Sequence, residues 1–414
     1  MLLLILFVYV AEEAFHSVVQ YLNLRYVREK GAAVPPGFEG SMNETAMRRI
    51  QNYEADKTRF GFVSSLFGAI SVIVFIFCGL LNSYNSWITS LNFPFLISGW
   101  LFFMLLSYAG EFLSVPFSLY QTFRIENAYA FNTMTPKLWV SDFMKSLLIS
   151  TLLLSVVILG GLGLIQWSPH YWWLLVGGFL LIFSLFIMYI SPYVIEPLFN
   201  KFTAVEDDVL REKITGLAGK AGIHASRVLK VDASIRSRHT NAYFTGIGKT
   251  KRIVLYDTLL EGMTHDEILA VLAHEIGHWK KRHILKKMAV LEIISLAALY
   301  LSFRLIRSDF LLSLFQIAQD TLFARVVLLA FLGGLLLAPL RPLMNSFSRR
   351  HEREADRIAH ELTGDTESMV RVFVKLSKEN LSNLYPHPLY VAMHYSHPPI
   401  LERIRYIKEM GQEA

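Results

Sequence analysis

The stretch HEIGHWKKRHILKKMAVLEIISLAALYLSF, residues 274–303, places two histidines four positions apart directly before an apolar run. The run, 288–303, is nearly long enough to cross a membrane as a helix. The whole chain has the matching composition, because 53% of its 414 residues are hydrophobic and only 18% are charged. The sequence therefore predicts a membrane protein with a polar, histidine-bearing region.

Seven apolar segments are candidate membrane spans. They cover residues 2–24, 61–82, 95–119, 146–166, 171–191, 288–303 and 326–344. The last two are short, so we expect neighbours to complete them or their helices to continue beyond the bilayer. An interfacial anchor is the alternative for the first segment, whose Glu12, Glu13 and His16 need protein or water around them.

Positive charge alternates between the loops. Segment 25–60 holds seven Lys or Arg residues and 120–145 holds three, whereas 83–94 and 167–170 hold none. Basic loops stay in the cytoplasm, so we expect the N-terminus outside and the C-terminus inside. The basic loop 304–325 departs from this alternation, which makes the last pair of spans the weakest part of the topology.

Charge and cysteine content exclude other classes. The net charge of +6 is typical of lipid-facing or cytoplasmic segments of a membrane protein, so we expect no nucleic-acid partner. The single cysteine, Cys78, cannot form an intrachain disulfide. We divide the chain into an N-terminal membrane region (1–192), a catalytic region (193–287), two last spans (288–344) and a C-terminal catalytic region (345–414).

The histidine pair lies on a predicted helix. Thr264 and Glu267 form a capping box at its start. His274 and His278 then share one face and could bind zinc at about 2.0–2.1 Å through their imidazole nitrogens. Glu275 lies beside the first histidine, where its carboxylate could take a proton from water at the metal. The pattern indicates a zinc peptidase; the alternative is an exposed helix with incidental histidines.

A third protein ligand is expected on a second helix, 345–364. Glu352 and Asp356 are four residues apart there and share a face with small alanines, which would permit a close approach to another helix. We predict Glu352 as the ligand, with Glu354 as the runner-up. Asp356 would accept an N–H from a ligating histidine. Spacing alone also allows an ordinary charged helix.

The catalytic region also contains predicted strands. Residues 228–234 form one, and 241–260 form two around a Gly-Ile-Gly-Lys turn.

At this level of detail the chain resembles the type 1 CAAX prenyl proteases, a family of multi-pass membrane zinc metalloproteases. The resemblance is spread over most of the chain. Its segments are SLYQTFRIENAYAFNTMT (118–135), EPLFNKFTAVED (196–207), HTNAYFTGIGKTKRIVLYDTLLE (239–261), HEIGHW (274–279), LMNSFSRRHEREAD (343–356) and HYSHPPILERI (394–404).

The resemblance implies roles for several residues. It also gives Glu352 as the third zinc ligand, although Arg353 stands where the family usually has an aromatic residue. His397 would stabilise the oxyanion of the reaction, and Arg403 would support the same pocket. Asn241 and Ala242 would belong to an edge strand to which the substrate adds by main-chain hydrogen bonds.

The implied fold is a mainly α integral membrane protein. About seven transmembrane helices enclose a water-filled chamber, and a small α+β zinc-metallopeptidase domain lies on the cytoplasmic side. The resemblance further implies one zinc ion per chain, a peptide or protein substrate that is prenylated in the CAAX manner, and a lipid bilayer around a monomer. The terminal KEMGQEA carries no retrieval motif, which favours a bacterial cytoplasmic membrane over the endoplasmic reticulum.

Three rival functions differ in what they predict. A quality-control protease for membrane proteins would need no prenyl group. A transport or binding protein with a structural zinc would keep its function in Glu275→Gln. An intramembrane protease would have its histidine pair within an apolar span, whereas WKKRH follows the pair here.

Overall fold

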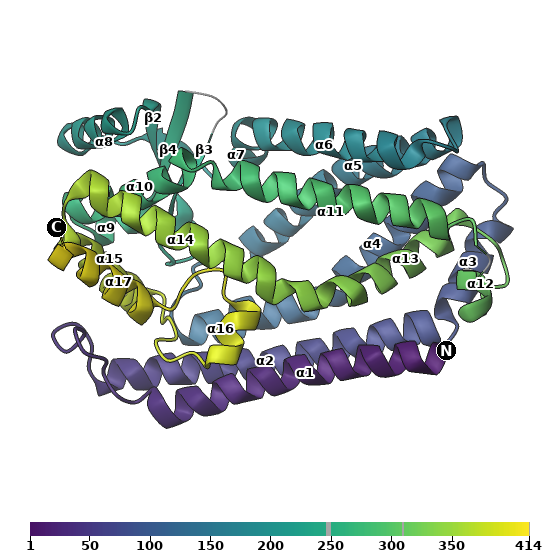
Figure 1. Ribbon diagram of the computed structural model, residues 1–414, viewed down its shortest axis with the longest axis horizontal. Helices are drawn as coiled ribbons and strands as arrows, with labels where there is room; N and C mark the ends of the chain where they lie inside the picture. Colours follow the sequence, from purple (N-terminus) through teal and green to yellow (C-terminus); the bar gives the residue numbers. More distant parts are fainter. Residues whose placement is uncertain (246–249, 309, 414) are drawn as a thin grey trace.

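The structure is a computed structural model that describes residues 1–245, 250–308 and 310–413. Long helices run along its longest axis, and a small sheet gathers with shorter helices at one end (Figure 1). Among the described residues, seven helical stretches are long and apolar enough to span a membrane. They are Leu2–Lys30, Glu44–Phe77, Phe95–Glu126, Pro136–Trp167, Trp172–Phe199, His283–Leu305 and Leu322–Thr363. The predicted fold class, with seven spans, is confirmed.

The helices of the membrane part follow the chain in order. They are α1 (Leu2–Lys30), α2 (Glu44–Phe77), α3 (Leu80–Ser90), α4 (Phe95–Tyr120), the π-helix η1 (Gln121–Glu126), α5 (Pro136–Trp167), α6 (Trp172–Ile190), the π-helix η2 (Ser191–Ile195), α7 (Glu196–Phe199), α11 (His283–Leu305), α12 (Phe310–Leu314) and α13 (Leu322–Leu337).

Most spans extend further than the apolar segments that predicted them, because hydropathy detects only the part of a helix that suits hydrocarbon. The second span is the exception. We expected it to reach residue 82, but α2 ends at Phe77. Gly79 adopts the left-handed conformation with φ of 82°, which breaks the helix before α3 begins at Leu80.

The seventh span leads almost directly into the second catalytic helix. Only the short 3-10 turn η4 (Ala338–Leu340) separates α13 from α14 (Arg341–Thr363). Pro342 stands in the first turn of α14, where its missing N–H costs no hydrogen bond. The predicted boundary at residue 344 therefore falls inside a helix, and the predicted helix start at residue 345 is wrong by one turn.

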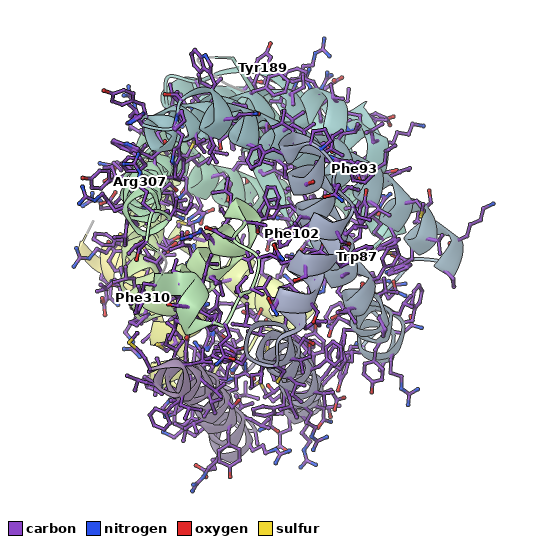
Figure 2. The ribbon with its side chains drawn as sticks, turned by 90° about the vertical axis from the view of Figure 1, so that its right-hand side faces the viewer. Trp87, Phe93, Phe102, Tyr189, Arg307 and Phe310 are labelled. Carbon is purple, nitrogen blue, oxygen red and sulfur yellow. The ribbon has the colours of Figure 1, made fainter. Side chains whose placement is uncertain are left out.

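The long helices bury few of their apolar residues. Figure 2 looks along them from the end that carries α3 and α12, and shows Trp87 and Phe310 on opposite sides of the ring. In the most apolar window of each span, between 0% and 28% of the residues are buried. A helix within a solid bundle would bury a continuous stripe. Most residues in these windows therefore keep some exposed surface, although α2, α4, α5 and α13 share a buried apolar cluster, and the chamber stays a prediction.

The polar end combines a four-stranded sheet with helices from both catalytic regions. Its elements are β1 (Phe202–Ala204), α8 (Asp208–Lys220), β2 (His224–Val231), the 3-10 helix η3 (Ala233–Ile235), β3 (Ala242–Thr245), β4 (Thr250–Tyr256), α9 (Asp257–Gly262), α10 (His265–Lys280), α15 (Thr366–Glu379), α16 (Pro388–His394) and α17 (Ile400–Glu413). The strand order is β1-β2-β4-β3, and only the central pair is parallel.

Three of the four strands were predicted, with wrong ends, and the short edge strand β1 was missed. β2 stops at Val231 because Asp232 begins the turn η3. β4 stops at Tyr256, and the Asp257 carboxylate then accepts the N–H groups of Ser234 and Thr258 as α9 begins. The Gly-Ile-Gly-Lys turn, 246–249, lies outside the described residues.

Candidate metal centre

Two helices from opposite halves of the catalytic end bring the predicted ligands together. The capping box of α10 is present: Thr264 Oγ1 accepts the N–H of Glu267, and Glu267 Oε2 accepts the N–H of Thr264. α10 packs lengthwise on α14. The turn between the two ligand histidines lies against the buried face of α14, so that the imidazoles point at Glu352.

Gly277 makes this approach possible. A Cβ atom at Gly277 would lie 2.7 Å from Cα and 2.9 Å from the carbonyl oxygen of Ala355, distances that side chains do not tolerate. Ala355 itself is fully buried. The small residues in the two predicted helices therefore face each other, one turn from the ligands.

The ligand atoms of His274, His278 and Glu352 all lie within 4.8 Å of one another. The two Nε2 atoms are 3.2 Å apart, and each is 3.3 Å from a Glu352 carboxylate oxygen. Bonds of about 2.0–2.1 Å in a tetrahedral site put neighbouring ligand atoms about 3.3–3.4 Å apart. Glu352 Oε2 is buried and has no hydrogen-bond partner among the described residues. The residues present therefore fit a divalent metal such as zinc.

Hydrogen bonds on the far side of each imidazole fix the direction of its lone pair. His274 Nδ1 donates to Asp356 Oδ1 at 2.8 Å. His278 Nδ1 lies 3.0 Å from His283 Nδ1, and His283 Nε2 lies 3.0 Å from Glu354 Oε2. If His283 donates to the glutamate, it accepts from His278. Both Nε2 atoms then present lone pairs to the centre, which is the tautomer that a metal requires.

Glu275 follows the first ligand on α10. Burial raises the pKa of its carboxyl, and Glu352 adds to that effect, whereas His274 and His278 oppose it. A carboxylate with a raised pKa is a better proton acceptor near neutral pH than an exposed one.

Comparisons with known proteins agree with this geometry. The family model described as CAAX prenyl protease N-terminal, five membrane helices, matches residues 23–201, and the model of peptidase family M48 matches residues 204–411. The CAAX prenyl protease 1 homolog of Arabidopsis thaliana is 33% identical over 94% of this chain and 93% of its own. CAAX prenyl protease 1 of Saccharomyces cerevisiae is 30% identical over 98% and 94%. The crystal structure of S. mikatae Ste24p superposes with a TM-score of 0.90 at 30% identity and covers 98% of both chains.

The chain belongs to the CAAX prenyl proteases of peptidase family M48. It is therefore a multi-pass membrane metalloprotease, and the predicted family and enzyme class are confirmed.

In this M48 peptidase His397 approaches the centre from the loop before α17. Its Nε2 lies 3.4 Å from Glu352 Oε1, and its Nδ1 lies 3.0 Å from Ser396 Oγ. The side chain is 62% exposed. A cavity of about 360 Å³ opens beside it. The residues lining that cavity include Glu54, Lys57, Asn380, Tyr395 and Pro398.

Arg403 lies behind His274 rather than beside His397. Its guanidinium forms two hydrogen bonds with the Asp356 carboxylate, one of 2.9 Å from Nε and one of 2.5 Å from Nη2. It also packs over the ring of Phe373. Arg403 therefore contacts Asp356 and His274, and its support of the oxyanion pocket stays a prediction.

Asn241 and Ala242 lie at the open edge of the sheet. β3 is an edge strand, since β4 is its one strand partner in the part of the chain that the structure describes. The N–H of Ala242 donates to Asn241 Oδ1 at 2.8 Å instead of to β4, so this donor faces the open side. β3 also packs against α10, which carries the metal ligands. The strand predicted to receive substrate thus lies next to the centre.

Sequence analysis assigned no role to His283 and ranked Glu354 as a possible ligand. Arg282 adopts a left-handed conformation with φ of 54°, which ends α10 and turns His283 back toward His278. Glu354 contacts His283 and not the cluster. The histidine at the end of WKKRH, one turn past the second ligand, was the available indication of this partner.

Proposed function

We propose that this chain is a zinc-dependent endopeptidase of the membrane that cleaves CAAX-type prenylated proteins. The observation that carries the proposal is the His274–His278–Glu352 cluster, with ligand atoms 3.2–3.3 Å apart and an orphaned carboxylate oxygen, at one end of a set of long apolar helices. The similarity to CAAX prenyl protease 1 of yeast and its Arabidopsis homolog supports the substrate class.

A bound zinc ion would supply Lewis-acid polarisation of the scissile carbonyl and of the attacking water. Glu275 accepts a proton from that water and passes it to the leaving amine. His397 donates to the carbonyl oxygen as charge develops on it. Asn241 and Ala242 hold the peptide backbone as an additional strand at the edge of β3. Asp356 and Arg403 hold His274 in its ligating tautomer and orientation.

The first experiment compares zinc content and peptide cleavage in purified wild type and Glu275→Gln. We expect about one zinc per chain in both, with cleavage reduced by about 10²–10⁴ only in the variant, because the proton acceptor is lost while the ligands remain. Glu261→Gln, an exposed glutamate on α9, is the matched control. Absence of zinc from the wild type, or normal cleavage by Glu275→Gln, would overturn the proposal.

The alternative is a quality-control protease that needs no prenyl group. One peptide prepared with and without a farnesyl group separates the two substrates. Faster cleavage of the farnesylated form supports CAAX processing. Equal rates favour the quality-control function.

We also propose that the catalytic end faces the cytoplasm. The membrane would be the bacterial cytoplasmic membrane or, in a eukaryote, that of the endoplasmic reticulum. The distribution of Lys and Arg between loops supports this orientation. It puts the turn between α2 and α3 outside, and this turn carries the single cysteine, Cys78, which is exposed. With the protein in a bacterial cytoplasmic membrane, an impermeant maleimide should therefore label Cys78 in intact cells. In Cys78→Ser/Lys57→Cys, labelling should need permeabilised cells, and the reverse pattern would invert the topology.

We propose a monomer, since the cluster and its hydrogen-bond partners come from one chain.

A further inference from the structure

A second cavity, of about 630 Å³, lies away from the metal centre at the junction between the fifth span and the sheet. One wall is the end of the span, with Tyr193 on η2 and Pro197 and Phe199 on α7. The other wall is one face of β2 and β4, with Arg227 and Arg252. The volume lies in the range of small-ligand sites.

Aromatic residues fix the depth of this cavity relative to the membrane. α6 begins with Trp172 and Trp173 and ends in the region of Tyr189, which is exposed and lies at the periphery of the ring in Figure 2. Tyr193 is also exposed and packs near Tyr189, with ring centroids 5.8 Å apart. Tryptophan and tyrosine rings collect where hydrocarbon meets headgroups. The cavity therefore opens at the headgroup level of the membrane.

Two arginines stand side by side in this cavity. Arg227 and Arg252 are register partners on the parallel strands β2 and β4, so their side chains project from the same face of the sheet. Neither has a carboxylate partner among the described residues. Like charges on adjacent strands destabilise a sheet unless an anion lies between them.

The surroundings add positive charge and orient one guanidinium. Lys201 also lines the cavity. The one acidic lining residue, Asp232, accepts the backbone N–H of Lys201 at 2.7 Å. The guanidinium of Arg252 stacks on Tyr193, 3.9 Å from the ring centroid. Stacking holds the planar group in place and leaves its N–H edge available for bidentate binding.

We propose that this cavity binds the phosphate of an anionic phospholipid headgroup. Arg227 and Arg252 pair with the phosphate oxygens, and Tyr193, Pro197 and Phe199 contact the glycerol and the first methylenes of the acyl chains. The site would anchor the catalytic end against the bilayer. It is independent of the peptidase chemistry.

Native mass spectrometry of the full-length protein in detergent tests this site, with phosphatidylglycerol and phosphatidylcholine of the same acyl chains as probes. We expect wild type to bind phosphatidylglycerol more tightly. Arg227→Gln and Arg252→Gln should each weaken that binding about fivefold and leave phosphatidylcholine unaffected. Lys137→Gln, which removes one exposed charge on α5 outside the cavity, is the matched control and should change neither affinity.

Equal losses in the control and in the arginine variants would overturn the proposal, because the effect would then reflect general surface charge. Glycerol 3-phosphate distinguishes a lipid from a soluble phosphate: if it displaces phosphatidylglycerol at comparable concentration, the lipid assignment fails. Arg252→Lys keeps the positive charge. It replaces wild type as the comparison if Arg252→Gln has a lower melting temperature. It should retain tighter binding than Arg252→Gln, and equal weakening in a well-folded pair would also contradict the proposal.

Discussion

Each imidazole of the metal cluster depends on a different partner at its second nitrogen. Asp356 holds His274, and His283 holds His278. Asp356 is further fixed by two hydrogen bonds from Arg403, and His283 by Glu354. The first pair was expected from the i,i+4 spacing of Glu352 and Asp356. The second arises only after the chain turns at Arg282, so helical periodicity could not indicate it.

His283→Phe is expected to lower zinc affinity about 10–100-fold, the usual effect of losing a partner behind a metal ligand. Phenylalanine keeps a flat ring in the buried place where His283 stacks on His351, with centroids 4.0 Å apart. It cannot accept the N–H of His278, which would then be buried without a partner. Competition with a fluorescent chelator on metal-depleted protein measures the affinity.

The matched control is His351→Phe. It keeps the same stacked pair, and His351 Nδ1 has no hydrogen-bond partner to lose. Zinc affinity should therefore stay at the wild-type value. A similar fall in both variants would show that the stack, and not the contact with His278, determines affinity.

The metal cluster depends on the close contact of α10 with α14. A Cβ atom at Gly277 would lie within 3 Å of the backbone of Ala355. A larger residue would therefore push the two helices apart and move the ligands that they carry. Helix propensity alone would favour alanine over glycine at such a position.

Gly277→Ala should destabilise the protein by about 1–3 kcal/mol through overpacking, against its gain in helix propensity. Gly216→Ala is the control, because Gly216 lies inside α8 with open space around its Cβ position. That variant should be neutral or more stable by up to about 1 kcal/mol. Thermal melting measures the stability of both variants, and zinc titration then measures the metal affinity of each. Equal stability of the two variants would contradict the role of Gly277.

The sequence predicted elements well where local rules decide them. The capping box at Thr264, the face shared by His274 and His278, and three of the four strands followed from local patterns. Helix ends could not be predicted in this way. One short turn joins α13 to α14, and the fall in hydropathy there indicated only where the apolar span ends. The contact of Arg403 with Asp356 could not be predicted either. The two residues are 47 positions apart in the sequence and meet because α17 packs against α14.

Over the whole molecule, several polar contacts tie the catalytic end to the spans, among them Arg236 with Asp142 on α5 and Tyr243 with Glu196 on α7. His239 forms another. Its Nδ1 lies 2.8 Å from Asn380 Oδ1 after α15, its Nε2 lies 3.6 Å from Glu126 Oε2 at the end of the third span, and its ring stacks on Phe131. Such a contact joins segments more than 100 residues apart, which no local pattern predicts.

The charge of His239 should make this connection sensitive to pH. The Glu126 carboxylate near its Nε2 raises the pKa of His239, burial opposes the rise, and the hydrogen bond with Asn380 adds to it, against a smaller effect of Lys57. A raised pKa means that the folded protein holds the proton more tightly than the unfolded chain. The resulting stability is fully present below about pH 6.5 and is lost as pH rises through the higher folded value.

His239→Gln should therefore lower the melting temperature more at pH 6 than at pH 8.5, because glutamine keeps a hydrogen-bonding group but carries no charge. The difference between wild type and variant is compared at each pH, so that titration of other groups, including the metal ligands, cancels. His170→Gln, an exposed histidine between α5 and α6, is the control. A difference that does not change with pH would mean that His239 joins the catalytic end to the membrane helices by packing on Phe131 alone, without help from the ion pair with Glu126.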